Sequence, residues 1–443
     1  LSTQTLSDFL TMKKYWTFLP LLGILFTTNA CREEYLNPSS ATEQQVVNSS
    51  DGLIALCNGL QQRYSTGGLL SVLYNRVAAG GLTTRELTVL NVGNIDEYNV
   101  SLGAGNITNA NAVVRNLWTQ SQLVKANADL VLRNVANAPE AGTQSGIVAY
   151  ASIFRALAMG TLAEFFEQSP LEAGENAPFS DRVAVLRDAV RQLEAAAATL
   201  AANPVSADFN AKIVPGIDLP NTLQALIARY SLFAGDYDKA LAAAGQVDLT
   251  KRSVFNFDDN TRNPLFEVAF GNRNVFEPTN AALGLPAELA PAADDKRLAF
   301  YLRTSPLPTQ NLGAGFYTAN NAPIPVYLPG EMLLIRAEAL ARKGDLPGAV
   351  AELNKVRTKT TDAFGIGAGL TAYAGPVEEA AVLAEIYRNR AIELAFQGFR
   401  LEDNRRLGRP GPGQAGAERN RNFLPYPRVE RENNPATPTD PAS

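Results

Sequence analysis

The sequence predicts a mainly α-helical protein built from tetratricopeptide-like helix pairs, together with a loop-rich half that has minor β structure. Three observations support this fold class. A helix–Gly-Asp–helix pattern occurs at 331–353 and again at 226–247. Other stretches place apolar residues at the spacing of amphipathic helices. The remaining long stretches are rich in Gly, Asn and Pro and lack periodicity, as loops do.

The pattern is clearest at 331–353, where one helical face carries Leu333, Leu334, Ala337, Leu340 and Ala341. The pair Gly344-Asp345 interrupts the period where a helix would end in a left-handed residue. An apolar period then resumes with Ala349, Val350, Leu353 and Val356. The stretch therefore predicts two helices joined by a tight turn.

The second copy, at 226–247, aligns Gly235-Asp236 with Gly344-Asp345. Ala228 then falls on Ala337, and Ala240 falls on Ala349, so small residues recur where two helices would approach closely. A hairpin of this kind that repeats is typical of tetratricopeptide-like arrays. Such arrays usually serve as binding scaffolds rather than as catalytic centres.

Five further stretches have the spacing of helices. The expected helices are Ser50–Tyr64 with Ser50 or Asp51 as cap, Asn116–Val135, Ala149–Phe166, Ser180–Leu200 with Ser180 as cap, and Ile386–Gly408. Leu123 belongs to the apolar residues of the second of these. Cys57 and Trp118 lie among apolar neighbours, so both are interpreted as core residues.

Two stretches are expected to be mostly loop. They are 74–111 and 250–325, the second with a minor strand pair near Leu265–Phe270. Loops held on a helical scaffold often carry ligand contacts. The candidate ligand-binding side chains are Tyr74, Asn75, Arg85, Glu86, Tyr98, Tyr301, Phe316 and Tyr317. The alternative for all of them is local or core packing.

Composition argues against several functions. The net charge of −5 disfavours general nucleic-acid binding, and the lack of histidine excludes a Ser-His-Asp hydrolase. The adjacent carboxylates Asp258-Asp259, Asp294-Asp295 and Glu378-Glu379 lack the separation of a glycosidase pair and are interpreted as solvated. A calcium site at 258–260 would lack EF-hand spacing. We therefore expect no catalytic residues, no metal site and no cofactor.

The first 48 residues predict export. Lys13-Lys14 precede a short apolar run, Trp16–Phe26, and small or polar residues lead to Cys31. This order indicates a signal peptide at 1–30 with Met12 as the true start. Thr28-Asn29-Ala30 before Cys31 resembles a lipoprotein box, which makes Cys31 the lipidated residue and 31–48 a tether. The alternative is an ordinary secretion signal with an incidental cysteine. Residues 31–443 are expected to form a single domain.

Four motifs in order resemble the SusD/RagB family of Bacteroidota outer-membrane lipoproteins. They are the Glu331-to-Ala339 segment, the Asn354/Arg357 step, the 389–406 segment with Glu393-Leu394 and Phe396-Gln397-Gly398, and the tail with Leu424-Pro425-Tyr426-Pro427, Glu430 and Asn434-Pro435. The chain departs from the family pattern at Asn389, Gln397 and Leu401. The resemblance implies a SusD-like fold with four tetratricopeptide-like helix pairs. Arg390 and Glu393 are expected to make structural ion pairs.

The resemblance also implies a function. A surface-exposed outer-membrane lipoprotein would capture a nutrient, above all an oligosaccharide, and deliver it to a SusC-like TonB-dependent transporter. No motif of the family fixes the ligand site, so no ligand residue is transferred. The alternative is a helical-repeat surface scaffold that recruits other proteins and has no nutrient pocket.

Overall fold

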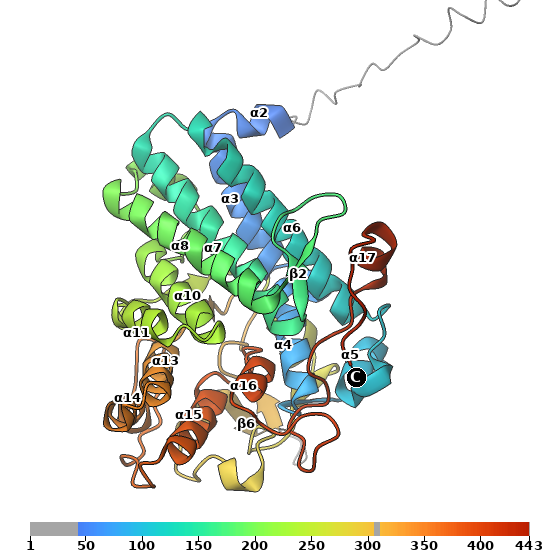
Figure 1. Ribbon diagram of the computed structural model, residues 1–443, viewed down its shortest axis with the longest axis vertical. Coiled ribbons are helices and arrows are strands. Elements are labelled where there is room, and N and C mark those ends of the chain that lie inside the picture. The colour runs from blue at the N-terminus through green and yellow to red at the C-terminus, as the bar shows by residue number, and fades with distance from the viewer. Residues whose placement is uncertain (1–42, 305–310, 443) are drawn as a thin grey trace, which may run out of the picture. The chain divides into compact units, whose positions relative to one another are not determined.

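The computed structural model describes residues 43–304 and 311–442. The described residues from Val47 onward form one compact unit (Figure 1). Met12, Cys31 and the other residues of the expected signal and lipobox lie outside the described residues. The first described helix is the short α2 (Glu43–Val47).

The long helices pack in successive pairs, with the members of each pair side by side (Figure 1). The pairs are α3 (Ser50–Ser65) with α6 (Ala112–Asn134), α7 (Ala141–Phe165) with α8 (Arg182–Ala202), α10 (Leu219–Phe233) with α11 (Tyr237–Gly245), and α13 (Pro329–Arg342) with α14 (Leu346–Thr358). Each pair packs on the next through α6 on α7, α8 on α10, and α11 on α13. This arrangement confirms the mainly α class and the four helix pairs.

The other elements are short or flank this array. The helices are α4 (Val72–Thr83), α5 (Ile95–Leu102), α9 (Ala207–Lys212), α12 (Arg297–Tyr301), α15 (Glu379–Glu393), α16 (Arg400–Arg406) and α17 (Arg428–Asn433). The single turns are η2 (Gly68–Leu70), η3 (Ala104–Asn106), η4 (Val135–Asn137), η5 (Phe266–Phe270) and η6 (Ala287–Leu289).

The strands form antiparallel pairs of two to three residues each. The pairs are β1 (Leu87–Val89) with β5 (Phe276–Pro278), β2 (Gln168–Pro170) with β3 (Phe179–Asp181), β4 (Val254–Phe255) with β8 (Ile324–Pro325), and β6 (Leu302–Thr304) with β7 (Asn311–Gly313). In register, Thr88 faces Glu277 and Ser169 faces Ser180. The β structure is therefore minor, as expected.

The two Gly-Asp turns have the same local structure. Gly344 and Gly235 are left-handed, with φ of 83° and 80°. The Asp345 carboxylate accepts the Gly348 amide at 2.9 Å, and the Asp236 carboxylate accepts the Lys239 amide at 3.2 Å. Each glycine thus ends one helix and each aspartate caps the next, which confirms both predicted hairpins.

Several predicted boundaries were wrong because neighbouring side chains make better caps. The cap of α3 is Ser49, whose Oγ accepts the Gly52 amide, rather than Ser50 or Asp51. The cap of α8 is Asp181 rather than Ser180, which lies in β3. The second expected helix, α6, begins earlier at Ala112 because the Asn111 side chain accepts the Val113 and Val114 amides. On that helix Leu123 is exposed instead of facing the core.

The largest error concerns 74–111, which is helical over α4 and α5 rather than loop. Helix α4 is buried on all sides, so its sequence shows no amphipathic period. Its central Gly80 lies where an added Cβ would be 2.6 Å from the carbonyl oxygen of Gly398. The glycines that suggested a loop therefore allow close packing of a helix.

Two other expectations were also wrong. The predicted strand pair at 265–270 is the single π-helical turn η5. Oδ1 of the Asn263 side chain accepts the Leu265 and Phe266 amides at its start. The predicted helix 386–408 is divided into α15 and α16 by a turn at 394–399. In this turn Phe396 and Gly398 have φ of 61° and 80°, values that no α-helix continues through.

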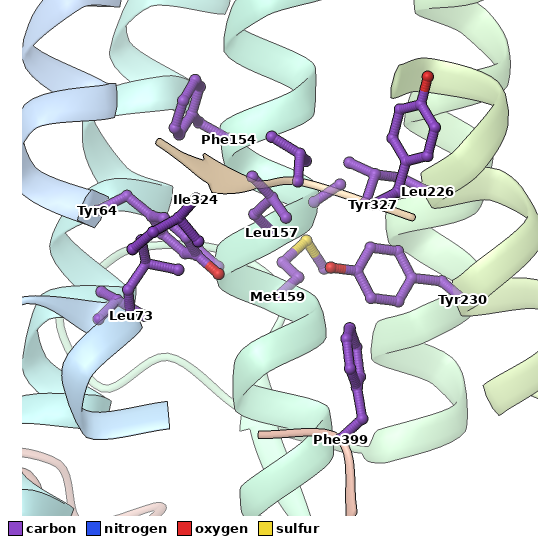
Figure 2. Packing of buried hydrophobic residues seen from close by; sticks show 14 of the residues in the cluster. Tyr64, Leu73, Phe154, Leu157, Met159, Leu226, Tyr230, Ile324, Tyr327 and Phe399 are labelled. Atoms are coloured by element: carbon purple, nitrogen blue, oxygen red, sulfur yellow. The ribbon is translucent and has the colours of Figure 1, made fainter. Parts of the chain in front are cut away.

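The main core lies between the helix pairs and the segment 324–328. Figure 2 shows Tyr64, Leu157, Tyr230 and Phe399 converging there, with Met159 between them. Helix α7 is long and apolar enough to cross a membrane, but 94% of its most apolar window is buried inside the protein. Cys57 and Trp118 are buried as predicted, and burial raises the pKa of the Cys57 thiol.

Candidate functional site

Three of the predicted ligand-binding residues instead stabilise the 394–399 turn. Tyr301 Oη donates to the Glu393 carbonyl at 2.6 Å, and Tyr317 Oη donates to the Phe396 carbonyl at 2.7 Å. The Glu86 carboxylate accepts the Phe396 amide at 3.2 Å. All three side chains are at most 3% exposed. They satisfy buried backbone groups that the break between α15 and α16 leaves open.

The other five predicted residues have different environments. Tyr74 is fully buried, and its Oη donates to Glu97 Oε1 at 2.7 Å. Phe316 is 8% exposed and packs edge-to-face on Phe300 and Phe364. Arg85 is exposed and Tyr98 is half-buried, but neither lines any of the three pockets around the segment 66–71. Asn75 lines an open pocket.

The predicted structural role of Arg390 and Glu393 is confirmed. Arg390 Nε lies 3.0 Å from Asp403 Oδ2, which joins α15 to α16. Glu393 lies 3.2 Å from Arg297 and also pairs with Lys359. Asp295, expected to be solvated, is buried and pairs with Arg297 at 2.6 Å, because that arginine is itself buried and needs a carboxylate partner.

Three pockets surround the segment 66–71, which connects α3 to α4. The Asn75 pocket has a volume of about 540 Å³ and is formed by this segment, α5, the start of α6 and residues 268–275. The Gly59 pocket, about 340 Å³, lies between α3 and α6. The Asp259 pocket, about 620 Å³, is bordered by Gln62, Thr66 and residues 259–267. Leu70 lines the first two pockets, and Gln62, Thr66 and Gly67 line the last two.

The segment between the pockets is held by its backbone. Gly67 and Gly68 have φ of 93° and 55°, a left-handed pair that reverses the chain after α3. The Leu69 carbonyl then accepts Nδ2 of Asn75 at 2.8 Å and Nδ2 of Asn116 at 3.0 Å. This anchoring leaves the side chains of Leu69 and Leu70 more than half exposed, at 53% and 54%.

The walls of the Asn75 pocket are joined by side-chain hydrogen bonds. Asp96 Oδ1 accepts the Ala112 amide at 3.0 Å, which fixes α5 to the start of α6. On the opposite side, Asn91 and Asn94 donate to Oδ1 and O of Asn274 at 3.1 and 2.9 Å. The pairing of β1 with β5 brings these two loops together. The pocket is therefore formed before any ligand enters.

The Asn75 pocket offers acceptors and one free cation. The amide nitrogens of Asn75 and Asn116 are used by Leu69, and no donor within the described part of the chain reaches their Oδ1 atoms. Arg115 on α6 is exposed, and its guanidinium makes no hydrogen bond or ion pair with any described residue. Glu97 adds a carboxylate that is already hydrogen-bonded to Tyr74. Together, these hydrogen-bond acceptors and the Arg115 guanidinium can exchange hydrogen bonds with a polyhydroxylated ligand.

Aromatic side chains do not contribute to these surfaces. No aromatic residue lines any of the three pockets. Across residues 43–304 and 311–442, every aromatic side chain whose burial is described is at least partly buried. Sugar rings therefore find no aromatic platform here, and the exposed apolar contacts come from Leu69 and Leu70.

The carboxylates of the described chain do not gather into a metal-binding group. At the proposed calcium position, Asp258 Oδ1 accepts the amides of Asn260 and Thr261 and the Thr261 hydroxyl. These hydrogen bonds, above all those from Thr261, lower the pKa of Asp258. These three donors therefore engage Oδ1 of Asp258 within its own turn.

Sequence reasoning missed Leu69, Leu70, Arg115 and Asn116. The two left-handed glycines before Leu69 were the available signal, because Gly67-Gly68 predicts a tight turn at the end of α3. No sequence feature distinguished Arg115 and Asn116 on α6, because arginine and asparagine are common on the surfaces of helices.

Comparison with known proteins shows a similarity to one family over part of the chain. Residues 250–439 match the SusD family. The fold is similar to that of a SusD superfamily protein from Bacteroides vulgatus, at 16% identity and a TM-score of 0.67, covering 91% of this chain and 99% of that chain. A comparison with curated protein sequences gives no match.

Two other solved structures are similar to the same extent. One is a SusD-like carbohydrate-binding protein from Bacteroides fragilis, at 17% identity and a TM-score of 0.66, covering 88% of this chain and 99% of that chain. The other is a laminarin-binding SusD-like protein, at 17% identity and a TM-score of 0.64, covering 89% of this chain and 99% of that chain. At these identities the similarity shows the fold.

Proposed function

We propose that this chain, which belongs to the SusD family, binds an oligosaccharide in the Asn75 pocket and passes it to a transporter without changing it. The observation that supports binding is the combination of open acceptors on Asn75 and Asn116 with the unpaired Arg115. Sugar hydroxyls both donate and accept hydrogen bonds, so they suit a pocket that offers both functions.

The exposed leucines complement these polar groups. Leu69 and Leu70 project beside the pocket, where they can cover the C–H faces of a sugar ring. Two similar structures are of proteins described as carbohydrate-binding and laminarin-binding. Laminarin and other neutral glucans are therefore the first ligands to test.

The pocket is suited to binding rather than hydrolysis. Asp96 and Glu97 are its carboxylates, but they are consecutive on α5. A glycosidase needs two carboxylates on opposite sides of the scissile bond. Asp96 and Glu97 also accept structural hydrogen bonds from Ala112 and Tyr74. Conversion of any bound glycan by the purified protein would contradict this part of the proposal.

Binding is tested with a glycan array, followed by calorimetry on the glycans that bind. Arg115→Ala should weaken binding roughly tenfold to hundredfold, since hydrogen bonds to a charged group contribute about 1.5–3 kcal/mol. Arg133→Ala is the matched control, because Arg133 is also exposed on α6 and also has no partner among the described residues. Equal affinity of wild type and Arg115→Ala would place the site elsewhere. No glycan binding at all would favour the scaffold alternative.

Delivery requires the membrane and a partner. In the proposal, Cys31 carries the lipid that holds the chain at the surface of the outer membrane, and a SusC-like TonB-dependent transporter receives the ligand. Family membership supports both parts. Cys31→Ser should move the protein from the membrane to the soluble fraction. Purification of the lipidated wild type in mild detergent should retain the transporter, and its consistent absence would count against delivery.

A further inference from the structure

Gly59 lies in the middle of helix α3, where glycine is unexplained by the protein itself. Its φ is not positive, and a Cβ added there would meet no heavy atom within 4 Å. Three glycines in the interior of other helices differ in this respect, because a Cβ at Gly80, Gly146 or Gly160 would lie within 3 Å of a neighbouring element. Glycine inside a helix costs stability relative to alanine. Its presence at an open position indicates that another molecule approaches the backbone there.

The surface in front of Gly59 is hollow, with apolar lining from Leu56 and Leu70 and several polar side chains at its border. The Gly59 pocket is bordered on α3 by Gln62 and Arg63 and on α6 by Gln120 and Asn127. Arg63 Nη1 donates to Gln120 Oε1 at 3.2 Å, which joins the two helices beside the pocket. The side chain of Asn127 makes no hydrogen bond with any other described residue, so its amide group is available. Amide groups of this kind bind hydroxyl-rich ligands rather than the apolar face of a partner helix.

This pocket continues from the Asn75 pocket along the same helix. Leu70 lines both pockets. On α6, Arg115 and Asn116 line the Asn75 pocket, whereas Gln120 and Asn127 line the Gly59 pocket. The distance from 115 to 127 along the helix is roughly 18 Å at 1.5 Å per residue. A ligand that reaches across both pockets must therefore be several sugar units long.

We propose that the groove over Gly59, between α3 and α6, is a second glycan subsite that binds the continuation of the chain held in the Asn75 pocket. This inference rests on the proposed oligosaccharide binding. The absence of a side chain at Gly59 lets the sugar chain lie against the helix backbone, and Asn127 bonds its hydroxyls. The protein thereby selects oligosaccharides over mono- and disaccharides.

The test uses a glycan array that displays each glycan backbone both as a disaccharide and as a chain of six or more units. Gly59→Leu fills the groove at a position with room for a side chain. It should weaken binding of the long chains by roughly tenfold or more, a change that calorimetry resolves easily. Binding of the disaccharides should not change. Asn127→Ala should reduce long-chain binding in the same way, without touching the α3 backbone.

Gly245→Leu is the matched control, because Gly245 ends α11 and also has no heavy atom within 4 Å of an added Cβ. Long-chain affinity that stays at the wild-type value in both Gly59→Leu and Asn127→Ala would overturn the second subsite while leaving the Asn75 pocket intact. If the wild type binds none of the arrayed glycans, the proposed function itself fails. Equal loss for long and short chains would also overturn the subsite, since it would mean that the two pockets act as one.

Discussion

Glu86 Oε1 lies 3.0 Å from Nη2 of Arg400, and this buried ion pair joins residues that are 314 positions apart in the sequence. The same carboxylate oxygen accepts the Phe396 amide, and Arg400 Nη1 donates to the Leu283 carbonyl at 3.1 Å. The pair therefore fixes the turn between α15 and α16 to the segment that follows α4. Glu86 and Arg400 are 1% and 4% exposed, so water cannot replace either partner.

Removing one member of this pair should destabilise the fold strongly. Glu86→Ala leaves the Arg400 guanidinium buried without its carboxylate, which costs about 3–5 kcal/mol in comparable pairs. Urea unfolding measures this as a lower free energy of unfolding. The neighbouring Arg85→Ala, at an exposed position, should stay within about 0.5 kcal/mol of the wild type. A small effect of Glu86→Ala would mean that solvent reaches Arg400.

Tyr317→Phe should affect stability and leave glycan affinity unchanged. The variant keeps the ring but removes the hydroxyl that donates to the Phe396 carbonyl, leaving a buried acceptor unsatisfied. The expected cost is about 1–3 kcal/mol in thermal or urea unfolding. Calorimetry on the folded variant should return the wild-type affinity, in contrast with Arg115→Ala. A loss of affinity at unchanged stability would restore Tyr317 as a ligand-binding residue.

Two mid-helix glycines should respond to alanine in opposite directions. Gly80→Ala places a Cβ 2.6 Å from the Gly398 carbonyl oxygen, and such overpacking typically costs about 1–3 kcal/mol. Gly59→Ala meets no atom within 4 Å and should stabilise α3 by about 0.5–1 kcal/mol. Melting temperatures of the two variants compared with wild type provide the measurement. A stabilising Gly80→Ala would show that α4 can move away from the 394–399 turn.

Lys125 should make stability depend on pH above neutrality. Burial lowers the pKa of Lys125 to about 8, although Asp129 favours its charge, and Nζ donates to the Pro170 carbonyl at 2.7 Å. In the unfolded chain the pKa returns to about 10.4, so between these values the unfolded state binds more protons than the native state. The contribution of Lys125 to the free energy of unfolding must then rise with pH across this window.

The Lys125→Met variant isolates this contribution. The free energy of unfolding of wild type minus that of Lys125→Met should grow by about 1–3 kcal/mol from pH 8 to pH 10. The exposed Lys251→Met variant should follow the wild type across the same range. Parallel curves for wild type and Lys125→Met would show that water reaches the lysine.

The sequence predicted those features that depend on near neighbours. The two Gly-Asp hairpins were found because a left-handed glycine and a capping aspartate act within one turn of their own helices. Asn75 was the one predicted site residue that lines the Asn75 pocket. The helix α4 was missed because burial on all sides removes the amphipathic period that sequence analysis uses.

By itself, then, the sequence determined the mainly helical class, the repeated hairpins and the resemblance to the SusD/RagB family, since each depends on local periods and ordered motifs. Tertiary structure decided which polar side-chain atoms already have a hydrogen-bond partner within the fold. Tyr301, Tyr317 and Glu86 are used inside the fold by backbone groups of the 393–396 segment, whereas Arg115 and the oxygens of Asn75 and Asn116 remain open. The physical reason is that a polar group becomes available to a ligand only when no distant segment of the chain has already satisfied it.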